Sequence, residues 1–287
     1  MTAMSEAIAA AFKAACRDEL EAPKPGNVHH FAPGRGKTAP QFMRSADAAA
    51  PALAAPGARV GLRILAAIEA TSAAVGTNTN LGIVLLCAPL AAAAELRPPD
   101  LRVALVGVLE TLDIEDANFA FRAIALASPG GLGRADRHDV FAPASVTLRQ
   151  AMAEAADRDR IARQYAFGFA DIFERGAAML GQGVLRFAEP RWATLATYLD
   201  FLSAFPDSHI VREHGVAAAD EVRSTAQGFL ARLQAAADPV DMLADLLEWD
   251  ELLKSRALNP GTSADLTVAT LFVHRLTNIL PSARNSG

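Results

Sequence analysis

Cysteine is scarce in this sequence, and we expect no segment that exports or anchors the chain. Two cysteines, Cys16 and Cys87, are too few for a disulfide framework. Glu6 lies where a signal peptide needs bases, and Lys13 interrupts the apolar N-terminal run. The longest apolar run, residues 81–94, contains Pro89 and is too short to cross a bilayer. We therefore expect a cytoplasmic protein that does not bind membranes.

An excess of basic residues is also lacking. The 287 residues include 27 basic and 32 acidic ones, so the net charge is −5. This balance argues against a protein that binds nucleic acid through its overall charge. Four of the basic residues are lysine and the others are arginine, so a lysine inside a rigid motif is informative.

Several common catalytic and binding motifs are absent. The sequence has no GxxxxGK[ST] phosphate loop, no GxGxxG after a strand and no GxSxG nucleophile elbow. It also has no HExxH pattern of a zinc site. These absences exclude the best-known nucleotide folds and zinc hydrolases, but helix-rich loops can still bind a nucleotide.

Helical periodicity dominates what is present. Apolar residues recur every three to four positions, hydrophobic residues make up 52% of the chain, and no hairpin signal occurs. The sequence predicts an all-α protein of ten or more helices in a single domain over residues 1–287; the glycine-rich segment 128–146 is the alternative domain break. The expected helices cover residues 5–21, 41–54, 61–75, 81–94, 100–112, 114–127, 148–156, 158–180, 190–204, 217–236, 240–257 and 264–279.

The first of four polar islands in this apolar background is Pro23-Lys24-Pro25-Gly26-Asn27. Two prolines restrict the backbone on either side of Lys24, so the turn is rigid. A rigidly held ammonium suits a phosphate group. The alternative is an ordinary solvated turn.

The second polar island is Gly76-Thr77-Asn78-Thr79-Asn80, directly before the most apolar helix. Backbone N–H groups at a helix start attract anions, and Gly76, Asn78 and Thr79 provide small or donor groups beside them. Ordinary capping by Thr79 or Asn80 is the alternative.

The third polar island is Asp207-Ser208-His209-Ile210-Val211-Arg212. Its acid and its arginine can pair across one helical turn, or they can be a capping aspartate and a surface arginine. The fourth polar island is Asn259-Pro260-Gly261-Thr262-Ser263-Ala264-Asp265, whose small residues let a ligand approach the backbone. Asp265 stands in the first turn of a helix, where it can also complement the helix dipole.

Two further acids are candidate magnesium ligands. Glu69 lies within a predicted helix about two turns before the second polar island, and Asp116 lies in the first turn of another helix. Carboxylate oxygens suit magnesium. The alternatives are an ion pair or exposed helix face for Glu69 and the helix dipole for Asp116.

The four polar islands, taken in order, resemble the triphosphoribosyl-dephospho-CoA synthase family. The resemblance runs from the Lys24 turn to the start of the last predicted helix. The matching residues are Pro23-Lys24-Pro25-Gly26, Glu69, Gly76-Thr77-Asn78-Thr79 with Gly82, Asp207-Ser208-His209-Ile210-Val211-Arg212 with Gly215, and Pro260-Gly261-Thr262-Ser263-Ala264-Asp265-Leu266.

The sequence departs from the family pattern in two places. The usual G-V-N-T-H-K-G motif reads Gly76-Thr77-Asn78-Thr79-Asn80-Leu81-Gly82 here, without the histidine and the lysine. The usual N-x-G-A-H-x-D-M segment after the first polar island is replaced by residues 30–38, without the same histidine and aspartate.

The resemblance implies an all-α enzyme that breaks the adenine–ribose bond of ATP. It would transfer the triphosphoribosyl group to the 2′-hydroxyl of dephospho-CoA, with Mg²⁺ on the triphosphate. Two alternatives stay open because of the departures. One is a phosphoribosyl transferase acting on another hydroxyl acceptor, for example in pterin-type one-carbon cofactor biosynthesis; the other is a nucleotide-binding protein without the chemistry.

The resemblance also suggests roles for the residues of the polar islands. Asp207 and Asp265 would be catalytic, one as general base and one stabilising the cationic transition state. Glu69 or Asp116 would hold magnesium, and a homodimer stays open from the sequence. The groups expected to bind phosphates are Lys24, Gly76, Asn78, Thr79, Arg212 and Ser263.

Overall fold

The chain is helical throughout the part that the structure describes. The computed structural model describes residues 2–32, 36–130, 133 and 137–281. Within these residues there are fourteen α-helices and no strand, apart from one isolated bridge between His29 and Ala32. This confirms the predicted all-α class. None of these helices combines the length and the apolarity that a membrane span needs.

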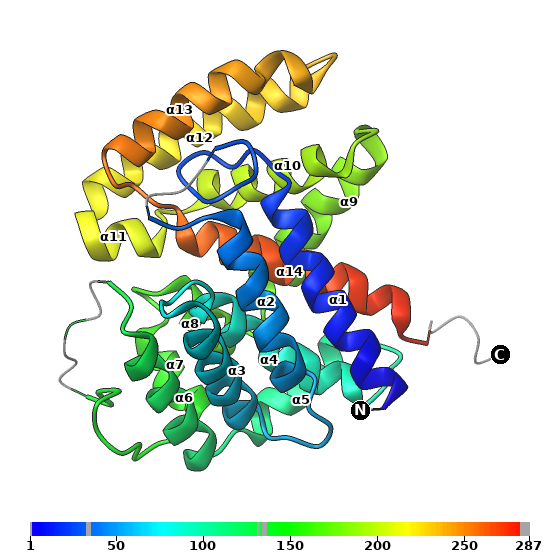
Figure 1. Cartoon of the computed structure of the whole chain (residues 1–287), viewed down its shortest axis with the longest axis vertical. Coiled ribbons are helices and arrows are strands. Elements are labelled where there is room, and N and C mark those ends of the chain that lie inside the picture. Colours follow the sequence, from blue (N-terminus) through cyan, green and yellow to red (C-terminus); the bar gives the residue numbers. More distant parts are fainter. Residues whose placement is uncertain (1, 33–35, 131–132, 134–136, 282–287) are drawn as a thin grey trace.

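The N-terminal helices form the lower part of the molecule in Figure 1, with α1 crossing its middle. Their bounds are α1 (Ala3–Leu20), α2 (Ala39–Leu53), α3 (Val60–Val75), α4 (Leu81–Glu95), α5 (Leu101–Thr111), α6 (Ile114–Ala127), α7 (Leu148–Ala155) and α8 (Arg160–Ala166).

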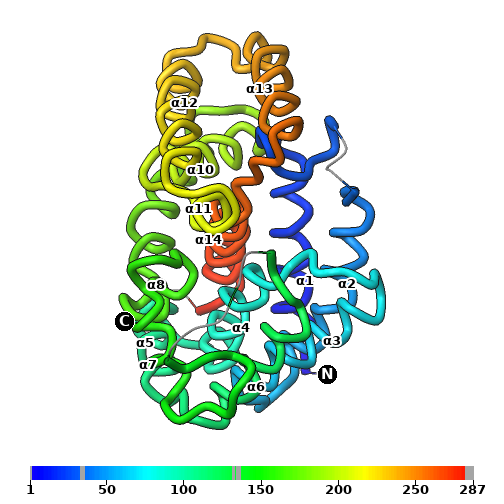
Figure 2. Tube along the Cα trace, turned by 90° about the vertical axis from the view of Figure 1, so that its left-hand side faces the viewer, coloured from blue at the N-terminus to red at the C-terminus, as the bar shows by residue number. Residues whose placement is uncertain are grey.

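The C-terminal helices form the upper part, and α14 returns through the centre (Figures 1 and 2). Their bounds are the π-helical turn η1 (Asp171–Gly176), α9 (Ala177–Arg186), α10 (Pro190–Ala204), α11 (Ser208–His214), α12 (Val216–Ala235), the 3₁₀ turn η2 (Pro239–Met242), α13 (Leu243–Ser255) and α14 (Gly261–Ile279).

Helix α14 is the central element of the packing. It contacts α1, α4 and α10 along its length, and also α8, α9, α11 and η1. Both large hydrophobic clusters include residues of α10 and of α14: Leu266 belongs to one and Ala264 to the other. We propose from this sharing that the chain folds as the single domain expected over residues 1–287.

Helix α4 is the apolar core of the lower part. Twelve of its 15 residues are buried, as expected for the most apolar run of the sequence. Both cysteines are buried and unbonded. Pro89 lies inside α4 and has no N–H, so the carbonyl of Leu85 loses its helical partner. The hydroxyl of Tyr165 in α8 donates to that carbonyl at 2.6 Å and so satisfies it.

The prediction of one helix over residues 158–180 is wrong, because helix α8 ends at Ala166 and a turn follows it. Gly168 and Phe169 both have positive φ, 60° and 58°, and the π-helical turn follows them. The Phe169 ring is fully buried, so packing of this aromatic side chain compensates for an unfavourable backbone conformation. A periodicity argument counts Phe169 as one more apolar position and cannot detect this turn.

Smaller differences occur elsewhere. Helix α11 was not expected as a separate helix, and α14 begins three residues before the predicted start at 264. Residues 131–132 and 134–136 of the alternative domain break lie outside the described residues.

The bond from Tyr165 to α4 predicts a stability effect. Tyr165→Phe leaves the buried Leu85 carbonyl unpaired, so we expect the free energy of unfolding to fall by about 1–3 kcal/mol. Urea unfolding measures the change. Pro89→Ala restores a backbone N–H at position 89. In the Pro89→Ala background, Tyr165→Phe should therefore lower the free energy of unfolding clearly less than it does in the original chain. An equal cost in both backgrounds would contradict this explanation.

Candidate functional site

A cavity of about 860 Å³ lies where the four polar islands meet. The first residues of α4, α8 and α14 border it, together with α11. The cavity is lined by apolar side chains, namely Leu81, Ile83, Leu85, Phe121, Ile124, Met152 and Ile161. Its polar lining residues include Glu19, Asn27, Lys37, Asn78, Thr79, Asp159, Arg212, Lys254, Asn259 and Asp265.

The carboxylate of Asp207 joins α11 to α14. It is fully buried, and one oxygen accepts the backbone N–H groups of His209 and Ile210 at 2.9 and 3.3 Å. The other oxygen accepts the N–H and the hydroxyl of Ser263, both at 2.8 Å. Asp207 and Ser263 do not line the cavity. The structure thus places Asp207 between two helices and Ser263 beside it, and neither of these predicted site residues lies on the cavity wall.

Asp265 is the predicted catalytic residue that does face the cavity. It lies half-buried on α14, two residues after Ser263, and it has no hydrogen bond or ion pair with the described part of the chain. Its carboxylate lies directly on Gly82 of α4, where a Cβ would come within 2.0 Å of Oδ2. Burial, Asp207 and Glu19 raise the pKa of Asp265 well above its ordinary value, and Arg212 opposes the shift. The site thus holds an unpaired carboxylate with a strong affinity for a proton.

Lys24 is placed behind the cavity wall rather than on it. Its side chain is fully buried, and its ammonium contacts Glu19 at 2.8 Å, the Val28 carbonyl at 2.6 Å and Asn27 Oδ1 at 3.2 Å. These contacts use its three N–H groups. The prediction that Lys24 binds a phosphate is therefore not supported. The lysine holds Glu19 and Asn27 in place on the wall.

The first polar island is held tightly against the fourth. Gly26 has a φ of +81°, and a Cβ there would lie 2.8 Å from the Leu258 carbonyl and from Pro260 Cδ. The hydroxyl of Tyr198 donates to the Pro25 carbonyl at 2.6 Å. Asn27 donates to Asn259 at 2.9 Å, which links the two islands directly at the cavity.

The second polar island contributes two of its three predicted residues to the cavity. Asn78 and Thr79 line it, whereas Gly76 ends α3 with a φ of 69° and does not. Asn80 is the N-cap residue of α4, as one of the two alternatives predicted, but its side chain makes no capping bond; Asn78 Oδ1 accepts the N–H of Leu81 at 3.2 Å instead. The backbone carbonyl of Asn78 accepts a bond of 2.6 Å from Lys37.

Arg212 lies in the cavity wall, and its partners are not the aspartate of its own polar island. Its Nε donates to the Gly130 carbonyl at 2.8 Å, and one terminal nitrogen is 3.4 Å from Asp159 Oδ2. It does not pair with Asp207. Its side chain is 27% exposed, so a phosphate in the cavity can reach the guanidinium.

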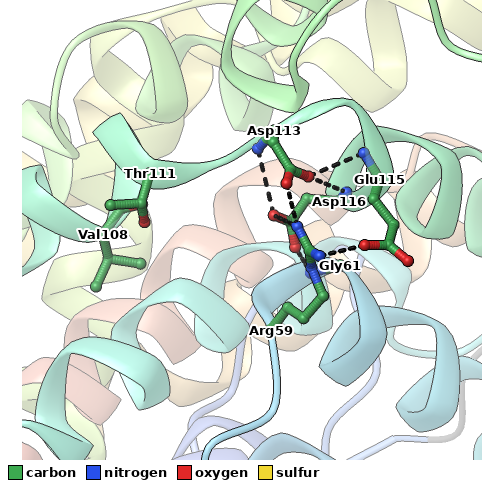
Figure 3. A network of polar contacts seen from close by, with 7 residues as sticks. All are labelled: Arg59, Gly61, Val108, Thr111, Asp113, Glu115 and Asp116. Carbon is green, nitrogen blue, oxygen red and sulfur yellow. Dashed lines mark hydrogen bonds and ion pairs between the residues drawn. The ribbon is translucent and has the colours of Figure 1, made fainter.

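The two predicted magnesium ligands lie elsewhere. Asp116 accepts the N–H of Gly61 at 2.8 Å at the junction of α3 and α6. Figure 3 shows Arg59 beside the carboxylates at the start of α6, those of Asp113, Glu115 and Asp116. Glu69 is exposed, 4.0 Å from Arg122. Neither acid lines the cavity, and the described residues contain no preformed cluster of three metal ligands.

Several wall residues were not predicted from the sequence. Lys254 pairs with buried Asp250 at 2.7 Å, and Asp250 accepts the N–H of Gly26 at 2.8 Å. Burial opposes ionisation of Asp250, but His29 and Lys254 outweigh it and lower its pKa. Asp159 caps α8 with one oxygen and turns the other toward Arg212. Only the capping pattern of Asp159 was visible in the sequence.

Comparisons with known proteins show the family of the chain. Residues 5–283 match the CitG family model, described as ATP:dephospho-CoA triphosphoribosyl transferase. Among solved structures, the chain is similar to one from Archaeoglobus fulgidus that is provisionally named a triphosphoribosyl-dephospho-CoA synthase. The two share 25% identity and a TM-score of 0.63 over 81% of this chain and 97% of the other. No curated protein sequence matches the chain.

The buried pair behind the wall predicts a large stability effect. Lys24→Met leaves the Glu19 carboxylate buried without its cation, so we expect a loss of about 3–5 kcal/mol in the free energy of unfolding. Lys13→Met, which removes an exposed pair with Asp47, should change it by less than about 1 kcal/mol. Adding Glu19→Leu to Lys24→Met should recover part of the loss. If Lys24→Met and Lys13→Met lowered the free energy of unfolding equally, this would contradict the structural role of Lys24.

Proposed function

The chain belongs to the ATP:dephospho-CoA triphosphoribosyl transferase family, and we propose that Asp265 is the general base of this reaction. The chain transfers the triphosphoribosyl group of ATP to the 2′-hydroxyl of dephospho-CoA and releases adenine. The observation that carries the assignment of the base is the unpaired carboxylate of Asp265 in a cavity formed by all four polar islands.

The cavity has the size and the lining for this chemistry. Its volume of about 860 Å³ is near the upper end of the range for small-molecule sites, as two nucleotide substrates require. The apolar lining residues suit an adenine ring, and the polar lining residues suit phosphates and ribose hydroxyls. The N-terminal ends of α4 and α14 both border the cavity, and their partial positive charge favours anionic groups.

The proposed reaction exchanges one bond at the anomeric carbon. The bond from C1′ of the ribose to N9 of adenine breaks, and C1′ bonds to the 2′-oxygen of dephospho-CoA. The hydroxyl proton passes to Asp265, and the electron pair of the broken bond leaves with adenine, which takes up a proton. Positive charge develops on the ribose in the transition state, and the lining carboxylates near Asp265, those of Glu19 and Asp159, stabilise it.

The raised pKa of Asp265 suits a general base. A base accepts a proton most effectively when its pKa approaches the working pH, and burial with neighbouring carboxylates moves Asp265 in that direction. Gly82 leaves the space in which this carboxylate lies. Asp207 fixes the start of α14 through Ser263, so it acts as a positioning residue.

The cationic wall residues would hold the phosphates. Arg212 and Lys254 line the cavity, and Asn78 and Thr79 add polar groups at the start of α4. A magnesium ion would neutralise the triphosphate charge. Asp159 would be a ligand for such an ion because it lines the cavity, and magnesium is commonly held by one or two carboxylates plus phosphates.

The alternatives from the sequence receive no support. Nothing in the comparisons favours a pterin-type acceptor or a protein without chemistry.

We propose that the reaction takes place in the cytoplasm, in line with two free buried cysteines and no membrane-spanning helix in the described residues.

Adenine release tests the function directly. Purified protein with ATP and Mg²⁺ should release adenine only when dephospho-CoA is present, and the product should carry the triphosphoribosyl group on the 2′-oxygen. Asp265→Asn should lower turnover about a hundredfold or more with unchanged thermal stability. Asp265 must be ionised to accept a proton. We therefore expect kcat/KM to fall as the pH drops through the pKa of Asp265, and this fall should occur above the usual aspartate pKa near ~4.

A second carboxylate provides the control. Glu154 lines the cavity rim and pairs with Arg137, so Glu154→Gln should keep turnover within a few-fold. Normal turnover in Asp265→Asn would remove Asp265 from the mechanism. Adenine release that ignores dephospho-CoA would contradict the transfer reaction.

A further inference from the structure

Lys37 is exceptional among the lysines of this chain. Its ammonium has no carboxylate within ion-pair distance in the residues that the structure describes, and its hydrogen-bond partner is the Asn78 carbonyl at 2.6 Å. The other three lysines form ion pairs with carboxylates: Lys13–Asp47, Lys24–Glu19 and Lys254–Asp250.

The position of Lys37 places this uncompensated charge in the cavity. It is half-buried in the wall, directly before Thr38, which caps α2. Its bond to Asn78 holds it against the turn 76–82 before α4, which has no basic residue of its own. Lys37 therefore supplies positive charge to a stretch of wall that has polar groups but no cation.

The surroundings leave capacity for an anion. An ammonium has three N–H groups, and one is used by the Asn78 carbonyl. Burial lowers the pKa of Lys37, and the carboxylates of Glu213 and Asp265 oppose the shift from beyond ion-pair distance. A partly desolvated ammonium with one neutral partner gains strongly from a negatively charged ligand.

We propose that Lys37 binds a condensed phosphate of a substrate at the N-terminal end of α4. The inference rests on the proposed function in so far as the phosphate belongs to one of its two substrates. Either the triphosphate of ATP or the diphosphate of dephospho-CoA has the required chemistry. Inorganic tripolyphosphate has the same condensed phosphate groups but no adenine or ribose, and it cannot undergo the transfer reaction.

Calorimetric titration with inorganic tripolyphosphate tests the proposal. Lys37→Met should weaken the Kd by about tenfold or more, the scale of a charge-assisted hydrogen bond, and Lys37→Arg should restore part of the affinity. Lys13→Met, which removes an exposed lysine on the surface, is the matched control and should leave the Kd unchanged. An unchanged Kd in Lys37→Met, or the same loss in Lys13→Met, would overturn the proposal.

Steady-state kinetics identifies the phosphate and separates binding from a structural role. A higher KM for ATP alone assigns Lys37 to the donor, and a higher KM for dephospho-CoA alone assigns it to the acceptor. A lower thermal stability with unchanged tripolyphosphate affinity would show that Lys37 only ties residue 37 to the α4 turn, which overturns the proposal. The titration needs no turnover, so failure of the transfer reaction leaves its result interpretable.

Discussion

The fully buried carboxylate of Asp207 is the joint on which the site depends. Its four hydrogen bonds fasten the start of α11 to the start of α14. Because Asp265 follows Ser263 by two residues on the same helix, this joint also sets the position of the carboxylate that faces the cavity. A buried anion is tolerated only when it is fully hydrogen-bonded, and Asp207 meets that condition.

A second buried ionic group also supports the cavity wall. Lys24 and Glu19 form a buried pair behind the cavity, and the Gly26 turn packs on Leu258 and Pro260 beside the start of α14. Direct hydrogen bonds thus join the fourth polar island to the first and to the third. The groups left uncompensated at the centre, Asp265 and Lys37, are those to which we assign chemistry and binding.

Much of the fold followed from the sequence, and less of the site did. Helical periodicity predicted most helices, and the order of the polar islands indicated the family that the comparisons show. The roles within the islands did not follow. Whether Asp207 or Asp265 is exposed, or Lys24 or Lys37 faces a ligand, depends on tertiary packing, which leaves no local pattern. The turn at Phe169 was missed for the same reason, since burial of its ring overrides the backbone preference.

A crystal structure with dephospho-CoA and a non-reactive ATP analogue would test the assignment of the base most directly. The 2′-hydroxyl of dephospho-CoA should lie within hydrogen-bond distance of the Asp265 carboxylate, about 2.6–3.2 Å, with the anomeric carbon of the donor beside it. Asp207 should keep its bonds to Ser263 and touch neither substrate. A 2′-hydroxyl placed far from Asp265, or bonded to Asp207, would contradict the assignment.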